Sequence, residues 1–365
     1  MIATQALHEA GQSVWLDSIN RELLEQGTLR HYIDDLAVTG LTSNPTIFDQ
    51  ALRRGDAYDD SVRSAVERGL HGEALFFQLA LEDLSSAAAL LRPIHQHTQG
   101  EDGWVSLEVS PLLAWQPVPT LEQVLTLHAR ASLPNLFIKI PGTPPGLRAI
   151  EEAIYAGVPI NVTLLFSAEQ YLAAANAYMR GIERRLQDGL SPDVPSVASL
   201  FISRWDKAVS GKVPDQLQNR LGIAAGQRTY RSYCGLRESR RVRHLESEGA
   251  SMQKLLFAST GTKDPSAPDT AYVEALAAPD TINTMPQGTL LAFADHGKVG
   301  RMLPRDGGDC EQVFGQFVAA GVDVDALAEQ LQREGAESFS KSWKSLMACI
   351  SEKSEALRAA HGAVR

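Results

Sequence analysis

Residues 135–166 read NLFIKIPGTPPGLRAIEEAIYAGVPINVTLLF, and this stretch decides the fold. Two short β-favouring apolar runs, 136–140 and 158–166, flank a segment with helical periodicity at 146–156. A strand, a helix and a second strand in this order predict a crossover unit with parallel strands. The first run contains Lys139, whose ammonium is costly to bury. It is therefore paired with an acid, extended towards water, or held partly neutral for chemistry.

The same alternation continues along the chain. We expect six further strands, at residues 13–19, 37–41, 105–109, 196–202, 254–259 and 280–284. Helical periodicity fills the other gaps, at 56–68, 74–91, 121–131, 168–188 and 216–248, the last with a break near Gly235. Eight such units in about 290 residues favour a closed (β/α)8 TIM barrel, an α/β fold, over an open doubly wound sheet.

The C-terminal part departs from this pattern. Residues 287–320 are rich in glycine and are predicted to be mostly loop, whereas 322–360 show the apolar spacing of one or two helices packed on the barrel. We therefore expect a single barrel domain over residues 1–365, with additional N- and C-terminal helices and a loop-plus-helix extension from about residue 287. The sequence has no dinucleotide-binding glycine motif and no P-loop.

The composition limits which classes of partner and which compartment the protein is expected to have. The net charge of −10 argues against nucleic acid and anionic membranes, so any phosphate site must be local. Cys234, Cys310 and Cys349 are far apart, which fits a reducing compartment and excludes a disulfide scaffold. The N-terminus lacks the apolar core of a signal peptide, and no apolar run reaches the roughly 18 residues of a membrane span. We expect a cytoplasmic protein.

Polar side chains occur at or just after seven of the eight predicted strands. In TIM barrels the chemistry lies at the carboxyl ends of the strands, while Val, Ile and Leu dominate the interior. A structural protein would not gain from so many polar groups there, so the pattern predicts an enzyme. The candidates are Asp17, Asn44, Glu108, Lys139, Asn161, Thr163, Ser199, Phe201, Arg204, Ser259 and Lys263.

Each candidate alone also has a structural interpretation. Asp17 resembles a helix cap, and Asn44 before Pro45 is typical of a turn. Glu108 is an obvious ion-pair partner for Lys139. Thr163 and Ser199 could be satisfied hydroxyls, and Arg204 and Lys263 surface charges. The catalytic interpretation depends on the whole set.

Taken together, the set suggests Schiff-base chemistry. The Lys139 amine would attack a ketose carbonyl and form an iminium, which draws electrons from the neighbouring carbon–carbon bond. Glu108 and Thr163 would move protons through a water molecule, and Asp17 would be the base for the sugar hydroxyl. Asn44 and Asn161 would bind the sugar, and Arg204 with Ser259 and Lys263 would hold a phosphate.

At these positions the sequence resembles the transaldolases, in particular their longer bacterial subfamily. The resemblance covers roughly residues 10–350, in the expected order. Six segments carry it: 39–48 (TGLTSNPTIF), 137–143 (FIKIPGT), 161–167 (NVTLLFS), 197–206 (VASLFISRWD), 255–264 (LLFASTGTKD) and 280–286 (DTINTMP).

The resemblance implies a class I aldolase-type barrel without a metal or cofactor. It also implies transfer of a dihydroxyacetone unit from sedoheptulose 7-phosphate to glyceraldehyde 3-phosphate in the non-oxidative pentose phosphate pathway, giving erythrose 4-phosphate and fructose 6-phosphate. Lys139 would be the Schiff-base lysine, Glu108 and Thr163 would handle the catalytic water, and Asp17 would be the acid/base.

Carried over in the same way, Asn44, Asn161 and Ser199 would contact substrate, and Arg204 would bind phosphate. Phe201 would favour transfer over free aldol cleavage, because relatives that act as fructose-6-phosphate aldolases tend to carry Tyr there. The sequence departs from shorter transaldolases after Ser259. They place a second phosphate-binding arginine there, whereas this chain offers Lys263, a point charge without the planar fork.

Three alternatives remain open. A fructose-6-phosphate-type aldolase would release free dihydroxyacetone. A metal hydrolase would need convergent ligands, and its best support is the pair His95 and His97, expected in a loop after Pro93. A regulatory barrel would be expected to have lost one of the four catalytic candidates, and all four are present. The expected partners are sugar phosphates, and the expected assembly is a monomer or homodimer.

Overall fold

The computed structural model describes residues 2–362. Eight parallel strands close into a barrel in sequence order. They are β1 (Gln12–Asp17), β2 (Val38–Thr42), β3 (Val105–Glu108), β4 (Leu136–Pro141), β5 (Ile160–Leu165), β6 (Ser196–Phe201), β7 (Lys254–Ala258) and β8 (Thr281–Met285). The predicted TIM barrel is confirmed, and each strand end lies within two residues of its predicted position.

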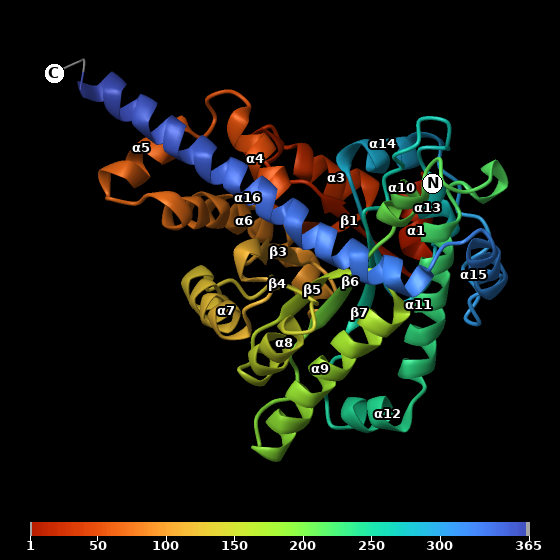
Figure 1. Cartoon of the computed structure of the whole chain (residues 1–365). Helices are drawn as coiled ribbons and strands as arrows, with labels where there is room; N and C mark the ends of the chain where they lie inside the picture. The colour runs from red at the N-terminus through yellow and green to blue at the C-terminus, as the bar shows by residue number, and fades with distance from the viewer. Residues whose placement is uncertain (1, 363–365) are drawn as a thin grey trace.

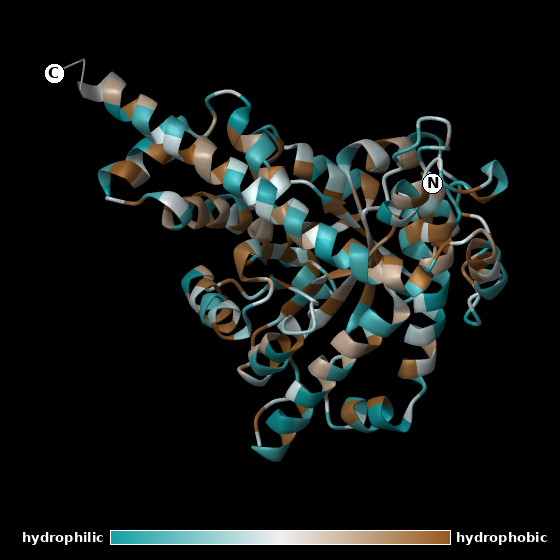
Figure 2. Ribbon diagram, viewed as in Figure 1, coloured by the Kyte–Doolittle hydropathy of each residue, from teal (hydrophilic) through white to brown (hydrophobic). Residues whose placement is uncertain are grey.

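Helices surround the barrel and turn their apolar residues towards it (Figures 1 and 2). The early ones are α1 (Ala3–Glu9), α2 (Arg21–Glu25), α3 (Thr28–Leu36), α4 (Pro45–Arg53), α5 (Asp59–Glu67) and α6 (Gly72–His97). There follow α7 (Pro117–Ala131), α8 (Gly146–Tyr155), α9 (Ala168–Gln187), α10 (Ser203–Val209), α11 (Leu221–Arg237) and α12 (Arg240–Ser247). The last are α13 (Ala271–Ala275), α14 (Gln287–His296), α15 (Cys310–Ala319) and α16 (Val324–Gly362).

Strand register brings the polar candidates side by side. Glu108 on β3 pairs with Lys139 on β4, and Lys139 pairs with Asn161 on β5. Asp17 on β1 pairs with Thr42 on β2 in the same way. Because directly paired residues point to the same face of a sheet, these side chains share the barrel interior.

The amino-terminal half of the barrel interior is aromatic. Phe137 stacks on Trp104, with ring centroids 4.1 Å apart, and on Trp15 at 6.3 Å. The Trp15 indole donates a 2.7 Å hydrogen bond to the buried carboxylate of Asp102. Gly40 on β2 leaves room for this indole, since a methyl group there would lie 2.4 Å from the ring. Rings therefore fill space that Val, Ile and Leu were expected to fill.

Helix α16 crosses the carboxyl end of the barrel (Figure 1). The buried side chain of Gln332 fixes it there by donating to the carbonyl oxygens of Gly142 and Leu164, each at 3.0 Å. Farther along, Ser342 bonds to Thr46 on α4 at 2.8 Å. The C-terminal helix is thus bound both to the barrel mouth and to the helix that follows β2.

Several predictions for the helices were wrong. Segment 287–320 is not mostly loop, because α14 and α15 form there, and α4 was not predicted at all. Helix α6 continues through Pro93, so His95 and His97 lie in its last turn instead of in a loop. The break expected near Gly235 lies at residues 238–239.

Helix α6 is the one described helix that is long and apolar enough to cross a membrane by length and composition. Its best window includes Glu82 and Asp83, so it is not an uninterrupted apolar run, and most of that window is buried inside the protein. A core helix passes the same test. Cys234, Cys310 and Cys349 are free and buried.

Candidate active site

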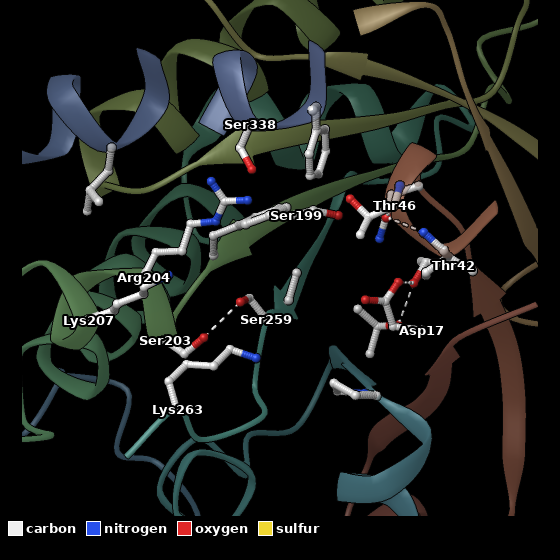
Figure 3. A pocket seen from close by; sticks show the side chains of 18 of the residues that line it. Asp17, Thr42, Thr46, Ser199, Ser203, Arg204, Lys207, Ser259, Lys263 and Ser338 are labelled. Carbon is white, nitrogen blue, oxygen red and sulfur yellow. Dashed lines mark hydrogen bonds between the residues drawn. The ribbon is translucent and has the colours of Figure 1, made fainter. Parts of the chain in front are cut away.

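A cavity of about 690 Å³ opens at the carboxyl end of the strands. Its walls come from six strands or the residues directly after them, from α4 and α10, and from α16 on the outer side. Figure 3 shows Asp17, Thr42 and Thr46 on one side, facing Arg204, Lys207 and Lys263 on the other. This is the end of the barrel at which the sequence predicts chemistry.

Lys139 reaches the cavity from β4 and is only 4% exposed. Its Nζ lies 3.5 Å from Glu108 Oε2 and donates a 3.2 Å hydrogen bond to the carbonyl oxygen of Ser43. The Ser43 hydroxyl in turn donates to the carbonyl oxygen of Ser106 at 2.8 Å, which ties the turn after β2 to β3. The structure therefore shows the ion pair that the sequence suggested, and it aims the amine at the cavity.

Glu108 and Thr163 are both buried and do not line the cavity. Burial raises the pKa of Glu108 to about 7, outweighing the nearby positive charge of Lys139, which lowers it. Apart from the ion pair between Glu108 Oε2 and Lys139, neither Glu108 carboxylate oxygen nor the Thr163 hydroxyl has a hydrogen-bond partner within residues 2–362. Buried polar atoms are rarely left unpaired, so these groups are suited to binding a small polar molecule.

Asp17 ends β1 and is held by a chain of hydroxyls. Thr42 Oγ1 donates to Asp17 Oδ1 at 2.7 Å and lies 2.7 Å from Thr284 Oγ1. Because Thr42 has one proton to give, Thr284 is the donor in the second bond. Burial raises the pKa of Asp17, opposed by Lys139 and by the Thr42 bond. Asp17 is not a helix cap, since Asn20 caps α2 by accepting from the Leu23 amide.

The two asparagine candidates have structural bonds of their own. Asn44 lines the cavity but also caps α4, accepting from the amides of Thr46 and Ile47. Asn161 is fully buried. Its amide donates to Ser106 Oγ at 3.2 Å, and its oxygen accepts from Ser199 Oγ at 2.7 Å. Asn161 therefore does not line the cavity, whereas Ser199 does.

The predicted phosphate ligands gather on one wall. Arg204 projects from α10, and Lys263 follows β7 (Figure 3). Ser259 Oγ bonds to Ser203 Oγ at 2.8 Å, with Ser259 in the left-handed backbone region at φ 56°. Burial lowers the pKa of Lys263 most, Asp17 opposes it, and the charges of Lys207 and Arg204 lower it further. Like charges collected in this way suit an anion.

Comparison with known proteins identifies the family. The model of the family described as "Transaldolase/Fructose-6-phosphate aldolase" matches residues 14–350. The chain belongs to this family.

Similar proteins with assigned names support the same family. A protein named "Transaldolase" from Saccharopolyspora erythraea is 40% identical over 356 residues, covering 96% of this chain and 97% of its own length. A "Transaldolase" from Frankia alni is 40% identical over 95% of this chain and 96% of its own length. One from Mycobacterium tuberculosis strain H37Rv is 39% identical, with 94% of each chain covered. The family and these names support transaldolase function, and the chain is an enzyme of this type.

In this transaldolase-family barrel, sequence reasoning missed several residues of the cavity wall. They are Thr42, Thr46, Lys207, Thr284, Glu334, Ser338 and Phe339. Thr284 could have been found from strand alternation, since it follows Ile282 by two in β8. Lys207 could have been found from helical spacing, three residues after Arg204. Nothing local in the sequence indicates that α16 would reach the mouth.

The metal-hydrolase alternative finds no geometric support. His95 packs edge-on against Trp104, with ring centroids 4.7 Å apart, and does not line the cavity. In the part of the chain that the structure describes, no three His, Cys, Asp or Glu side chains are grouped so that they could hold a metal ion. Convergent ligands are the minimum for such a site.

Proposed function

We propose that this enzyme transfers a dihydroxyacetone unit from sedoheptulose 7-phosphate to glyceraldehyde 3-phosphate through a Schiff base on Lys139. The products are erythrose 4-phosphate and fructose 6-phosphate, and the pathway is the non-oxidative pentose phosphate pathway. The supporting observation is the Lys139 amine, buried in the barrel mouth beside Glu108 and facing a wall of cations. This arrangement combines a nucleophile, an acid/base group and an anion site.

Schiff-base formation is the first step. The neutral Lys139 amine adds to the ketose carbonyl, and the carbinolamine then loses its oxygen as water to give an iminium. That loss needs a proton donor and the reverse needs a proton acceptor. Glu108, with a pKa of about 7, can be either at neutral pH, and a water held between Glu108 and Thr163 would carry the proton.

Carbon–carbon cleavage is the second step. Asp17 takes the proton of the sugar hydroxyl, the carbon–carbon bond breaks, and its electron pair moves into the iminium to leave an enamine. The aldose leaves as an aldehyde. The enamine then attacks the carbonyl carbon of the acceptor, protonated Asp17 returns its proton to the new alkoxide, and hydrolysis frees Lys139. The Thr42 bond keeps one Asp17 oxygen fixed while the other faces the reaction.

The substrate is oriented by the rest of the wall. Donor and acceptor each carry a terminal phosphate. Arg204, with Ser259 and Lys263, would bind this phosphate in either substrate. Ser199 and Asn44 would contact the sugar, and Asn161 would act through Ser199, which it holds. Phe201 supplies an apolar wall. Every step uses protons and electrons from protein and substrate, so the proposal includes no metal or cofactor. It also includes a cytoplasmic location, no nucleic-acid or membrane partner, and a monomer or homodimer.

Reductive trapping tests the central step. Borohydride added with fructose 6-phosphate should reduce the iminium to a stable adduct on the peptide that contains Lys139, identified by mass mapping. Lys139→Ala should give no adduct and no turnover. An adduct elsewhere, or undiminished activity in that variant, would refute the Schiff-base proposal.

The family description also includes fructose-6-phosphate aldolases, and acceptor omission separates the two activities. Without an acceptor aldehyde, a transaldolase stops at the Lys139 enamine and releases one equivalent of aldose per site. An aldolase continues and releases free dihydroxyacetone. Phe201 favours the first outcome, and sustained dihydroxyacetone release would favour the second.

A further inference from the structure

Arg204 is held without a polar partner. Across the described residues its guanidinium makes no hydrogen bond and no ion pair, although the side chain is half-buried. Glu334 is the acid with the largest influence on its charge, yet that carboxylate accepts a 2.6 Å hydrogen bond from Gln330 on its own helix. Something other than hydrogen bonding must fix the orientation of Arg204.

Two aromatic rings are close enough to do so. The Arg204 guanidinium carbon lies 5.6 Å from the ring centroid of Phe201 on β6 and 5.7 Å from that of Phe339 on α16. Both distances are within the range of a cation–π contact. Figure 3 shows Arg204 extending towards the helix that carries Ser338, the neighbour of Phe339.

The helix backbone also comes close. A methyl group at Gly335 would lie 3.3 Å from Arg204 Nη1 and 3.0 Å from Leu164 Cδ2. Glycine disfavours a helix interior, so a close approach is the physical reason for it here. The Gln332 bonds to Gly142 and Leu164 hold this turn of α16 against the barrel.

We propose that Phe339 and Gly335 are positioning residues that orient Arg204 for the substrate phosphate, so that α16 is part of the anion site. The guanidinium donates hydrogen bonds only in its plane. Aromatic rings that restrain it without accepting those bonds leave the N–H groups available for phosphate oxygens. This inference rests on the proposed role of Arg204 as the phosphate ligand.

Binding of inorganic phosphate tests the inference without relying on turnover. In isothermal titration calorimetry, Phe339→Leu should weaken phosphate binding by about threefold to tenfold, the size of one cation–π contact. Phe339→Tyr, which keeps the ring, should bind like the parent enzyme. The KM for fructose 6-phosphate should rise by the same factor in Phe339→Leu, with kcat within about twofold of the parent value.

Further variants distinguish a loss of stability, a failure of the positioning role and a failure of the phosphate role of Arg204. Leu346→Ala on α16, buried away from the cavity, should lower stability but leave phosphate affinity unchanged. Gly335→Ala should weaken phosphate binding even if Phe339→Leu fails to fold. If Arg204→Gln weakens binding but Phe339→Leu and Gly335→Ala do not, the positioning role is refuted and the phosphate role of Arg204 stands. If Arg204→Gln does not change phosphate affinity, the phosphate-binding role of Arg204 is refuted, and so is the positioning role of Phe339 and Gly335.

Discussion

Two opposite effects compete at Glu108. The ammonium of Lys139, 3.5 Å away, favours the carboxylate, while burial favours the neutral acid. Burial wins, and the pKa of Glu108 lies at about 7. A carboxyl group with such a pKa changes its charge in the range in which enzymes operate, which suits a group that both gives and takes a proton.

The first prediction concerns the pH dependence of the rate. Glu108 loses its proton as the pH rises through about 7, so the proton-donating form that Schiff-base formation needs is populated below that pH, and kcat/KM for the ketose should fall as the pH rises through it. Glu108→Gln should lower kcat by about 10²–10⁴-fold and remove this ionisation from the profile. Steady-state rates between pH 5.5 and 9 would show it. Persistence of the same ionisation in Glu108→Gln would assign it to another group.

The second prediction concerns Asp17. The bond from Thr42 favours the Asp17 carboxylate and so lowers its pKa. Thr42→Val, nearly the same shape, should raise the pKa of Asp17, because the carboxylate loses its donor. An acidic limb of the kcat profile that belongs to Asp17 should then move to higher pH. Thr284→Val keeps the Thr42 donor and should move the limb less. An equal shift in both variants would contradict the assigned direction of the bonds.

At the scale of helices and strands, the sequence predicted the strands better than their connections. A buried parallel strand is a short apolar run, which is visible locally. Helix α4 was missed because Asn44-Pro45 also fits a turn, although an N-cap followed by proline is itself a helix start. Helix α6 continues through Pro93, where a local pattern predicts an end.

Helix α16 shows where local patterns stop being informative. Its apolar spacing predicted a helix, but its position depends on Gln332 meeting the carbonyl groups of Gly142, just after β4, and Leu164, in β5, more than 160 residues earlier. The hydroxyls and cations at the strand ends could be predicted because barrel topology alone brings them together. The α16 wall of the cavity could not, because no rule of the barrel specifies where an added helix packs.

The third prediction tests the anchor of α16, the two hydrogen bonds that Gln332 donates to the barrel. Gln332→Leu keeps the side-chain volume but leaves the carbonyl groups of Gly142 and Leu164 without their donor. It should lower the free energy of unfolding by about 1–3 kcal/mol, measured by urea titration. Because α16 also forms the outer cavity wall, the KM for fructose 6-phosphate should rise as well. Arg333→Ala, at an exposed neighbouring position, should change stability by less than about 0.5 kcal/mol. Equal effects of both substitutions would argue against the anchor.

The whole barrel has two unlike ends. Its carboxyl end holds the charged and hydroxyl groups, and its amino end holds the stacked rings of Trp15, Trp104 and Phe137. Buried charges such as Lys139 and Glu108 are costly unless they are paired, and a site that holds them needs rigid surroundings, which the aromatic layer supplies. The sequence indicated the polar end because its residues break apolar runs. The aromatic layer joins three separate segments, so no single stretch revealed it.

The fourth prediction tests how rigidly the aromatic layer of Trp15, Trp104 and Phe137 is packed. Gly40→Ala would place a methyl group 2.4 Å from the Trp15 ring, which is itself held by its hydrogen bond to Asp102 and by the stack on Phe137. Such overpacking should lower the free energy of unfolding by at least about 2 kcal/mol. The matched change Gly235→Ala, in α11 with open space around it, should instead raise it by about 0.5–1 kcal/mol, because alanine favours the helix. Urea unfolding should therefore show changes of opposite sign in the free energy of unfolding of the two variants. A neutral Gly40→Ala would mean that Trp15 can leave the barrel interior at little cost, and the aromatic layer would then not be the rigid base of the active site.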